Sequence, residues 1–345
     1  MKNIVFDLGG VLFARDKSKC TPELLEFFSF LRAPRMPLFW EEYDRGTSTL
    51  EEVTATISGM AAFFSALFGT PLTAALFAMM VEDVGLTFTS AFMPAFTSAL
   101  IAYGVSLFFG IAPTNFVLNS IPHLTLETAL QTALLGIACA AVTRLFCWTL
   151  HTLEHGIPKR IPNPWLRAFA GGAAVVAFSY LFGVGRYNGA GMAVIADAVE
   201  QGTALPWDFA CKIFLTALTL AVGFKGGEVV PSFFVGATFG CVAGPLLGLP
   251  AEFSAAIGLV AVFCGATNCP LASTFLSVEL FGDGGLLYFA VACGVSYVLS
   301  GYNGLYSSQT ILYSKLKAEY INVRTNAYHA GGPHQEPPVS GSLKK

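Results

Sequence analysis

Apolar residues gather into long runs over most of this chain, whereas charged residues gather in the first fifty positions. A helix needs about 20 apolar residues to cross the hydrocarbon core of a bilayer, so the longest runs predict membrane-spanning helices. Shorter runs, and runs broken by Gly and Pro, predict re-entrant or half-spanning helices, which membranes tolerate where protein surrounds them. The apolar runs cover residues 57–81, 86–118, 128–150, 166–184, 208–223, 229–249, 253–281 and 285–300. This pattern is typical of a transporter or channel.

Composition supports lipid as the solvent for most of the chain. Of its residues, 54% are hydrophobic and only 12% are charged, whereas an average soluble domain carries about a quarter charged residues. The net charge of −3 gives no reason to expect nucleic acid as a partner. The eight cysteines have no paired spacing, so the sequence indicates neither a zinc site nor a disulfide framework. We expect no metal and no other cofactor.

After the first fifty positions, basic residues are concentrated in one loop and in the tail. The loop runs from His151 to Arg167, and the tail carries Lys315, Lys317 and Arg324. The positive-inside rule places both in the cytoplasm. Residues 317–345 are therefore expected to be a cytoplasmic tail, disordered toward its end because it is rich in Gly, Pro, Ser and His. His151 and His155 would share one helix face, an arrangement better explained by a helix end at the membrane interface than by half a metal site.

One segment has the features of an anion site. An apolar helix ends near Phe224, a flexible Gly226-Gly227 pair follows, and Glu228 then leads into a second apolar helix with Pro231 in its first turn. The free amides and the positive dipole end of such a helix favour anions. Ionisable residues at membrane depth are candidates for function. Glu228 is therefore a candidate to take up a proton as an anion leaves.

Two other segments form a weak internal repeat. Residues Phe68–Phe77 resemble residues Ala266–Phe275, because both place Pro-Leu at the start of an apolar helix that follows a small-residue segment. Long-spaced internal repeats are common in transporters. We therefore expect two similar helix starts.

The stretch Gly223–Gly240 resembles the helix-N motif of the CLC family of anion channels and antiporters. Its Gly-Gly-Glu-Val-x-Pro form is similar to the fluoride–proton antiporter branch. Three further motifs in the same order resemble that branch: helices G and H, helices O and P, and the start of helix R. They are Phe64–Phe77, Gly265–Leu271 with Ser277–Gly282, and Ser300–Tyr306. The similarity covers about residues 57–316.

The resemblance implies an all-α polytopic membrane protein of tilted and half-spanning helices, arranged as two inverted halves and working as a homodimer. It implies transport of fluoride, or of chloride, across a bacterial inner membrane, either channel-like or in exchange for protons. Carried over to this chain, Glu228 and Val229 offer backbone amides to the anion, with Val230 beside them, and Tyr306 donates its hydroxyl. Glu228 is also the proton-coupling candidate.

Three positions or segments depart from the family pattern. Val230 stands where the fluoride branch has Thr, which removes a hydroxyl, and Met80 stands where the family commonly has Glu. The family's first helices, which carry its gating glutamate, have no counterpart in residues 1–57. We expect this truncation to leave half of the anion pathway unlined and to impair transport.

Residues 1–53 form a different, short α/β fragment. Ile4–Leu12 resembles the first motif of haloacid dehalogenase-like hydrolases, and Phe39–Ser48 resembles the start of their cap helices. Asp7 would be the nucleophile of such an enzyme. The later motifs are missing, and 53 residues are too few to close a doubly wound domain, so we interpret Asp7 as vestigial and the chain as a fusion without enzyme activity. Two alternatives remain open: a phosphatase that uses Asp7, and an inactive fusion remnant.

Overall fold

A computed structural model describes residues 50–326, apart from five single positions. Those positions are Leu86, Phe88, Asn119, Val184 and Ala318. The expected hydrolase-like fragment with Asp7 and most of the expected tail lie outside the described residues.

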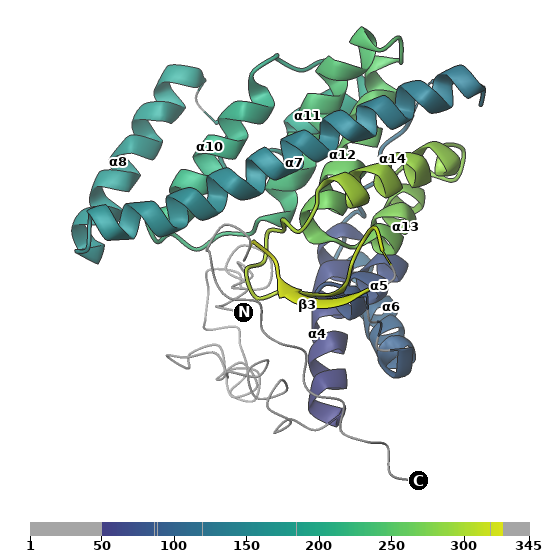
Figure 1. Ribbon diagram of the computed structural model, residues 1–345, viewed down its shortest axis with the longest axis horizontal. Helices are drawn as coiled ribbons and strands as arrows, with labels where there is room; N and C mark the ends of the chain where they lie inside the picture. Colours follow the sequence, from purple (N-terminus) through teal and green to yellow (C-terminus); the bar gives the residue numbers. More distant parts are fainter. Residues whose placement is uncertain are drawn as a thin grey trace.

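Helices make up most of the described chain (Figure 1). The α-helices are α4 (Leu50–Phe68), α5 (Pro71–Met80), α6 (Phe92–Phe108), α7 (Leu126–Arg160), α8 (Pro164–Phe182), α9 (Met192–Glu200), α10 (Asp208–Ala221), α11 (Val229–Leu246), α12 (Ala251–Thr267), α13 (Pro270–Phe281) and α14 (Leu286–Leu299). A 3₁₀ turn, η3 (Thr89–Ala91), precedes α6, and the strands are β1 (Asp83–Val84), β2 (Thr310–Tyr313) and β3 (Tyr320–Arg324). The predicted all-α class is confirmed.

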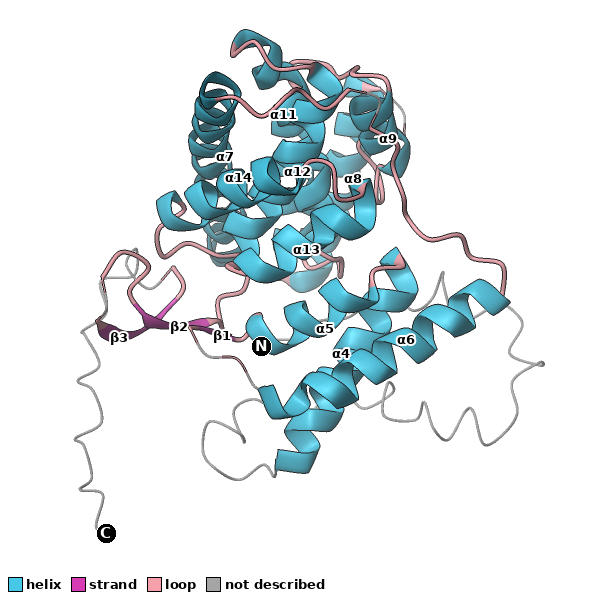
Figure 2. Cartoon of the chain, turned by 90° about the vertical axis from the view of Figure 1, so that its right-hand side faces the viewer, coloured by secondary structure: helices cyan, strands magenta, loops and turns pink. Residues whose placement is uncertain are grey.

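Full-length and shorter apolar helices occur together, as the broken runs predict. Within the described residues, four segments are long and apolar enough to cross a membrane: Thr89–Phe108, Leu126–Arg160, Pro164–Phe182 and Val229–Leu246. The other apolar helices have 10–17 residues. Helix α7 runs across the helices around it, while α4, α5 and α6 lie together at one end (Figure 2).

Helices α11 and α12 form the centre of the packed core, and their backbones touch. A Cβ on Gly236 would lie 2.3 Å from the Gly258 carbonyl oxygen, and a Cβ on Gly240 would lie 2.1 Å from the Ser254 carbonyl oxygen. Any larger side chain at either glycine would collide with main chain. From Phe253 to Thr267 every residue of α12 is buried, so this pair is enclosed by the remaining helices.

The predicted internal repeat is visible in backbone geometry. Pro71 and Pro270 each occupy the first turn of a helix, and the residues before them have nearly the same conformation: φ −122°, ψ 76° at Thr70 and φ −116°, ψ 73° at Cys269. The two helices, α5 and α13, pack against each other. The carboxylate of Glu279 on α13 accepts the N–H of Leu72 in α5.

The segment after α14 differs from the expected start of a helix R. In the described residues after Leu299 it forms turns and then strand β2, which pairs in parallel with β1 and antiparallel with β3. The β-branched Thr310 and Ile311 suit a strand, and the N–H of Thr310 donates to the carbonyl of Glu82. The expectation of a helix here is therefore wrong for this structure.

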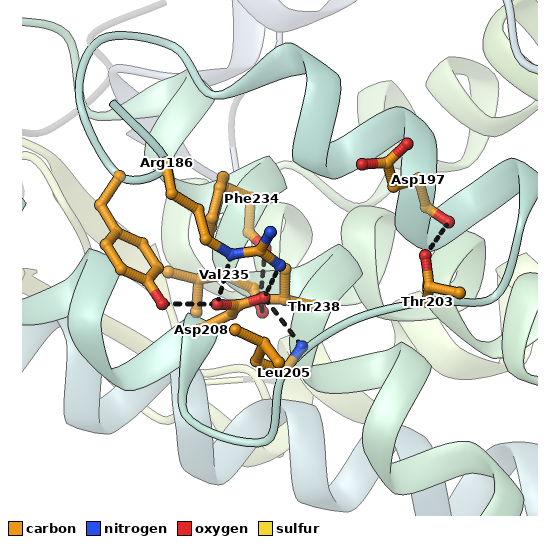
Figure 3. A network of polar contacts seen from close by, with 9 residues as sticks. Arg186, Asp197, Thr203, Leu205, Asp208, Phe234, Val235 and Thr238 are labelled. Atoms are coloured by element: carbon orange, nitrogen blue, oxygen red, sulfur yellow. Dashed lines mark hydrogen bonds and ion pairs between the residues drawn. The ribbon is translucent and has the colours of Figure 1, made fainter. Parts of the chain in front are cut away.

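A buried polar cluster ties the loop between α8 and α9 and the loop between α9 and α10 to the start of α10. Asp208 at the start of α10 is 0% exposed, and its carboxylate accepts bonds from the Arg186 guanidinium at 2.6 and 3.0 Å. The Tyr187 hydroxyl donates to it at 2.7 Å and the N–H of Leu205 at 2.9 Å (Figure 3). A buried charge needs such partners, and here the partners come from two loop segments that the carboxylate ties together.

Candidate functional site

The candidate site is the first turn of α11. Glu228 is the residue before the helix, and the first intrahelical bond runs from the N–H of Ser232 to its carbonyl at 3.1 Å. Within the described residues, the amides of Glu228, Val229 and Val230 have no main-chain acceptor. The next residue, Pro231, has no amide hydrogen. The helix start therefore presents these three N–H groups, without a main-chain acceptor, at its positive dipole end.

The residues just before the helix leave open space around these amides. Residues 223–227 are exposed. A Cβ on Gly227 would meet nothing within 4 Å, and one on Gly226 would meet only the Leu220 side chain, at 3.5 Å. Gly223 has φ +104°, a conformation that suits glycine and turns the chain from α10 toward α11. The Gly-rich segment thus keeps side chains away from the free amides.

The carboxylate of Glu228 lacks, among the described residues, a hydrogen-bond partner that a buried oxygen needs. Its Oε2 atom is buried and has no hydrogen-bond partner in the described part of the chain. A buried polar atom without a partner is costly, and a functional role or a bound water or ion is among the explanations for one. Glu228 interacts electrostatically with His151 and Glu154 of α7.

Tyr306 lies in the same region. The turn that carries it is fixed by the bond from the N–H of Leu305 to the carbonyl of Ala266 at 2.9 Å and by the Thr325 hydroxyl, which donates to the Tyr306 carbonyl. Tyr306 is close enough to Glu228 for the two to interact electrostatically. The structure therefore brings together Tyr306 and the α11 first turn, which holds the other predicted site residues.

Aromatic rings pack directly behind the site. Phe233 in α11 is 3% exposed, and its ring centroid lies 5.4 Å from that of Phe68 and 5.0 Å from that of Phe263. Phe234 is fully buried, with the Lys212 ammonium 5.0 Å from its ring centroid. Both phenylalanines serve packing in this structure, which leaves the backbone of α11 as the polar surface of the site.

His151 is a residue that the sequence did not assign to the site. The sequence suggested a helix end at the membrane interface, yet the side chain is only 13% exposed and interacts with Glu228. Nothing in the local pattern around His151 indicates this, because the contact joins α7 to residues far along the chain. Among the described residues, no group of three or more His, Cys, Asp or Glu side chains is placed to hold a metal ion.

Comparison with known proteins adds to this geometry. The sequence profile of the family described as voltage gated chloride channel matches residues 40–301. A chloride/fluoride channel protein of Pseudomonas syringae pv. tomato is 36% identical over 265 residues, which cover 75% of this chain and 58% of that protein. A voltage-gated ClC-type chloride channel of Citrobacter koseri is 25% identical over 70% of this chain and 60% of its own. The chain thus spans about three fifths of these relatives.

Solved structures with a similar fold agree with the family match. The crystal structure of a CLC-type fluoride/proton antiporter has a TM-score of 0.72 and 35% identity, covering 74% of this chain and 65% of the other. A eukaryotic CLC transporter, at 19% identity, has a TM-score of 0.58 over 80% of this chain and 47% of its own. Because the eukaryotic transporter is only 19% identical, its similarity supports the fold alone.

Proposed function

Because this chain belongs to the voltage-gated chloride channel family, we propose that it moves a halide ion across a bacterial inner membrane. The observation that carries the proposal is the first turn of α11, where free amides adjoin Glu228, whose carboxylate has one buried oxygen without a hydrogen-bond partner in the described residues. Backbone N–H groups at a helix start bind an anion through a partial positive charge. Such binding is weak enough to permit release, as permeation requires.

Fluoride is the preferred ion of this proposal. The relative at 36% identity is named a chloride/fluoride channel protein, and the structure at 35% identity is a fluoride/proton antiporter. The Gly-Gly-Glu-Val segment before Pro231 supports the same choice. Chloride remains the competing ion, and channel-like flow the alternative to exchange for protons.

The proposed roles follow the geometry. Glu228, Val229 and Val230 offer backbone amides to the anion, and Tyr306 donates its hydroxyl from the turn after α14. Val230 has no side-chain hydroxyl, so at this position only the main chain can hold the ion. The carboxylate of Glu228 takes up the proton. We further propose a homodimer and a cytoplasmic C-terminus, which the basic end of α7 supports.

Flux from liposomes tests the proposal. Vesicles loaded with fluoride and containing the purified protein should release fluoride, measured with a fluoride electrode, faster than protein-free vesicles. Chloride-loaded vesicles, read with a silver chloride electrode, test selectivity. If neither ion leaves faster than from empty vesicles, the halide proposal fails for this chain.

The role of Glu228 is tested in the same vesicles. Glu228→Gln should reduce proton counterflow more than anion binding, because the amide cannot carry the proton but leaves the backbone donors in place. Equal losses of both would show that Glu228 is structural. The phosphatase alternative has no supporting observation, and Asp7 lies outside the described residues.

A further inference from the structure

One nitrogen of His151 lies between a donor and an acceptor. Its Nε2 is 2.9 Å from the Gly304 carbonyl oxygen and 2.9 Å from the Asn326 amide nitrogen. The orientation of that amide is set by Gly304, whose N–H donates to Asn326 Oδ1 at 3.3 Å and whose carbonyl accepts from Asn326 Nδ2 at 2.9 Å. A protonated Nε2 can donate to Gly304, and an unprotonated one can accept from Asn326. This surrounding therefore suits either protonation state of Nε2.

The other nitrogen of His151 is available for proton exchange. Nδ1 is buried and has no hydrogen-bond partner in the described residues. The Glu154 carboxylate lies 3.8 Å from it, on the next turn of α7. The Glu154 side chain is 55% exposed, while that of His151 is 13% exposed. Glu154 and His151 together thus connect solvent with a buried imidazole ring.

Glu228 stands directly before α11, which packs against α7, the helix of this pair. It interacts electrostatically with His151, and also with Cys147, which stands one turn before His151 on α7. The three groups Glu154, His151 and Glu228 therefore run from an exposed carboxylate through a buried imidazole to a buried carboxylate oxygen without a partner.

We propose that His151 carries the proton between Glu154, at the exposed end of α7, and Glu228, at the start of α11. The inference rests on the proposed function, because it supplies the proton route for that same site. A proton entering through Glu154 converts the ring to an imidazolium. Transfer to the Glu228 carboxylate then leaves a neutral ring and a neutral acid, so one proton enters the route and one arrives at the anion site.

The charged groups that face His151 match this role. Glu154 faces it from its own helix and Glu228 from α11. From the turn after α14 and the end of the described chain it meets only neutral groups, the Gly304 carbonyl and the Asn326 amide. Two carboxylates from different segments, both interacting with one imidazole, give a proton both a source and an acceptor. The turn that carries Gly304, a hydrogen-bond partner of His151, also carries Tyr306.

The test uses His151→Gln with His155→Gln as the matched control. Glutamine keeps a group that can donate or accept, but it does not titrate. His155 lies one turn further along α7 and is exposed. In fluoride-loaded liposomes, His151→Gln should lower proton counterflow per fluoride by about tenfold or more, because a proton-transfer group has been removed. His155→Gln should leave that ratio unchanged. Glu154→Gln, at an exposed position, should lower the ratio without affecting folding.

A second measurement separates this inference from the proposed function. In full-length protein labelled with ¹⁵N-histidine, Glu228→Gln should displace the pH at which the His151 signal titrates and leave the His155 signal in place. Absence of any fluoride flux in the unaltered protein would defeat the proposed function, while the titration would still decide whether His151 and Glu228 share a proton. The relay is overturned if His151→Gln keeps the full proton ratio, or if Glu228→Gln leaves the His151 titration where it was.

Discussion

The Glu279 carboxylate of α13 accepts the backbone N–H of Leu72, in the first turn of α5, at 2.9 Å. Its second oxygen accepts the N–H of Thr73 at the same distance. The start of α5 has no side-chain cap from its own N-cap residue. Glu279, from the other helix of the repeat, accepts its amides instead. A carboxylate at a helix N-terminus satisfies free amides and complements the helix dipole.

Replacing Glu279 should therefore destabilise the contact between α5 and α13. We expect Glu279→Ala to lower the free energy of unfolding by about 1–3 kcal/mol, since two partly buried amides lose their acceptor. Thermal unfolding in detergent, followed by size-exclusion chromatography, measures the loss. Glu127→Gln, at an exposed position in the first turn of α7, is the control. Equal melting temperatures for the two variants would contradict the capping role.

The buried carboxylate of Asp208 should be essential for the loop before α10. Asp208→Asn leaves the Arg186 guanidinium without its counter-charge. We expect a loss of about 3 kcal/mol, toward the lower end for a broken buried pair, because the Arg186 side chain is 31% exposed. Asp197→Asn removes the same charge outside this cluster and should change the unfolding midpoint little. Chemical unfolding of both variants decides the point.

Gly240 should not tolerate even a methyl group. In Gly240→Ala the new Cβ would lie 2.1 Å from the Ser254 carbonyl oxygen, and the backbones of α11 and α12 would have to separate. Overpacking of this kind costs about 1–3 kcal/mol or more. Gly59→Ala is the matched control, since nothing lies within 4 Å of its Cβ and alanine favours a helix. The melting temperature should fall for the first variant and stay level or rise for the second.

Lys315 should make the attachment of the β2–β3 segment depend on pH. Its ammonium donates to Asn268 Oδ1 at 2.5 Å, to the Tyr297 carbonyl at 2.9 Å and to the Ser300 hydroxyl at 3.1 Å. Burial lowers the pKa of Lys315 from 10.5 to about 7. Below pH 7 the amine is charged whether the segment is attached or released, so attachment does not vary with pH there.

Between pH 7 and 10.5 the released amine keeps its proton while the attached amine loses it, so rising pH favours attachment. Proteolysis of the segment, normalised to an unstructured peptide, should slow as the pH rises through this window. Lys315→Met should remove that dependence. Faster cleavage of the unaltered protein at higher pH would show that the sign is wrong.

Local patterns predicted the helix starts well, because Gly, Pro and apolar runs act over a few residues. The starts at Pro71 and Pro270 and the turn before Glu228 follow from such patterns. Helix α9 was missed, since it is short, amphipathic and carries Asp197 and Glu200. An apolar run of membrane length is not needed for a helix that packs on others.

What the sequence could not predict are contacts between distant segments. The cap from Glu279 to α5 and the position of His151 beside Glu228 depend on how helices pack, which no local pattern contains. Strand β2 is a further case, because its pairing with β1 decides its conformation. The roles of Val229, Val230 and Tyr306 remain predictions, although the structure places them in one region.

The glycine contacts between α11 and α12 limit what can move during transport. Because main chain lies against main chain at Gly236 and Gly240, we expect the two helices to move as one unit. The amides at the start of α11 should therefore keep their position relative to α12. In an alternating transport cycle built on this fold, the parts that move are then the ones around these amides: the Glu228 side chain, the turn with Tyr306, or the segments that approach from the opposite side.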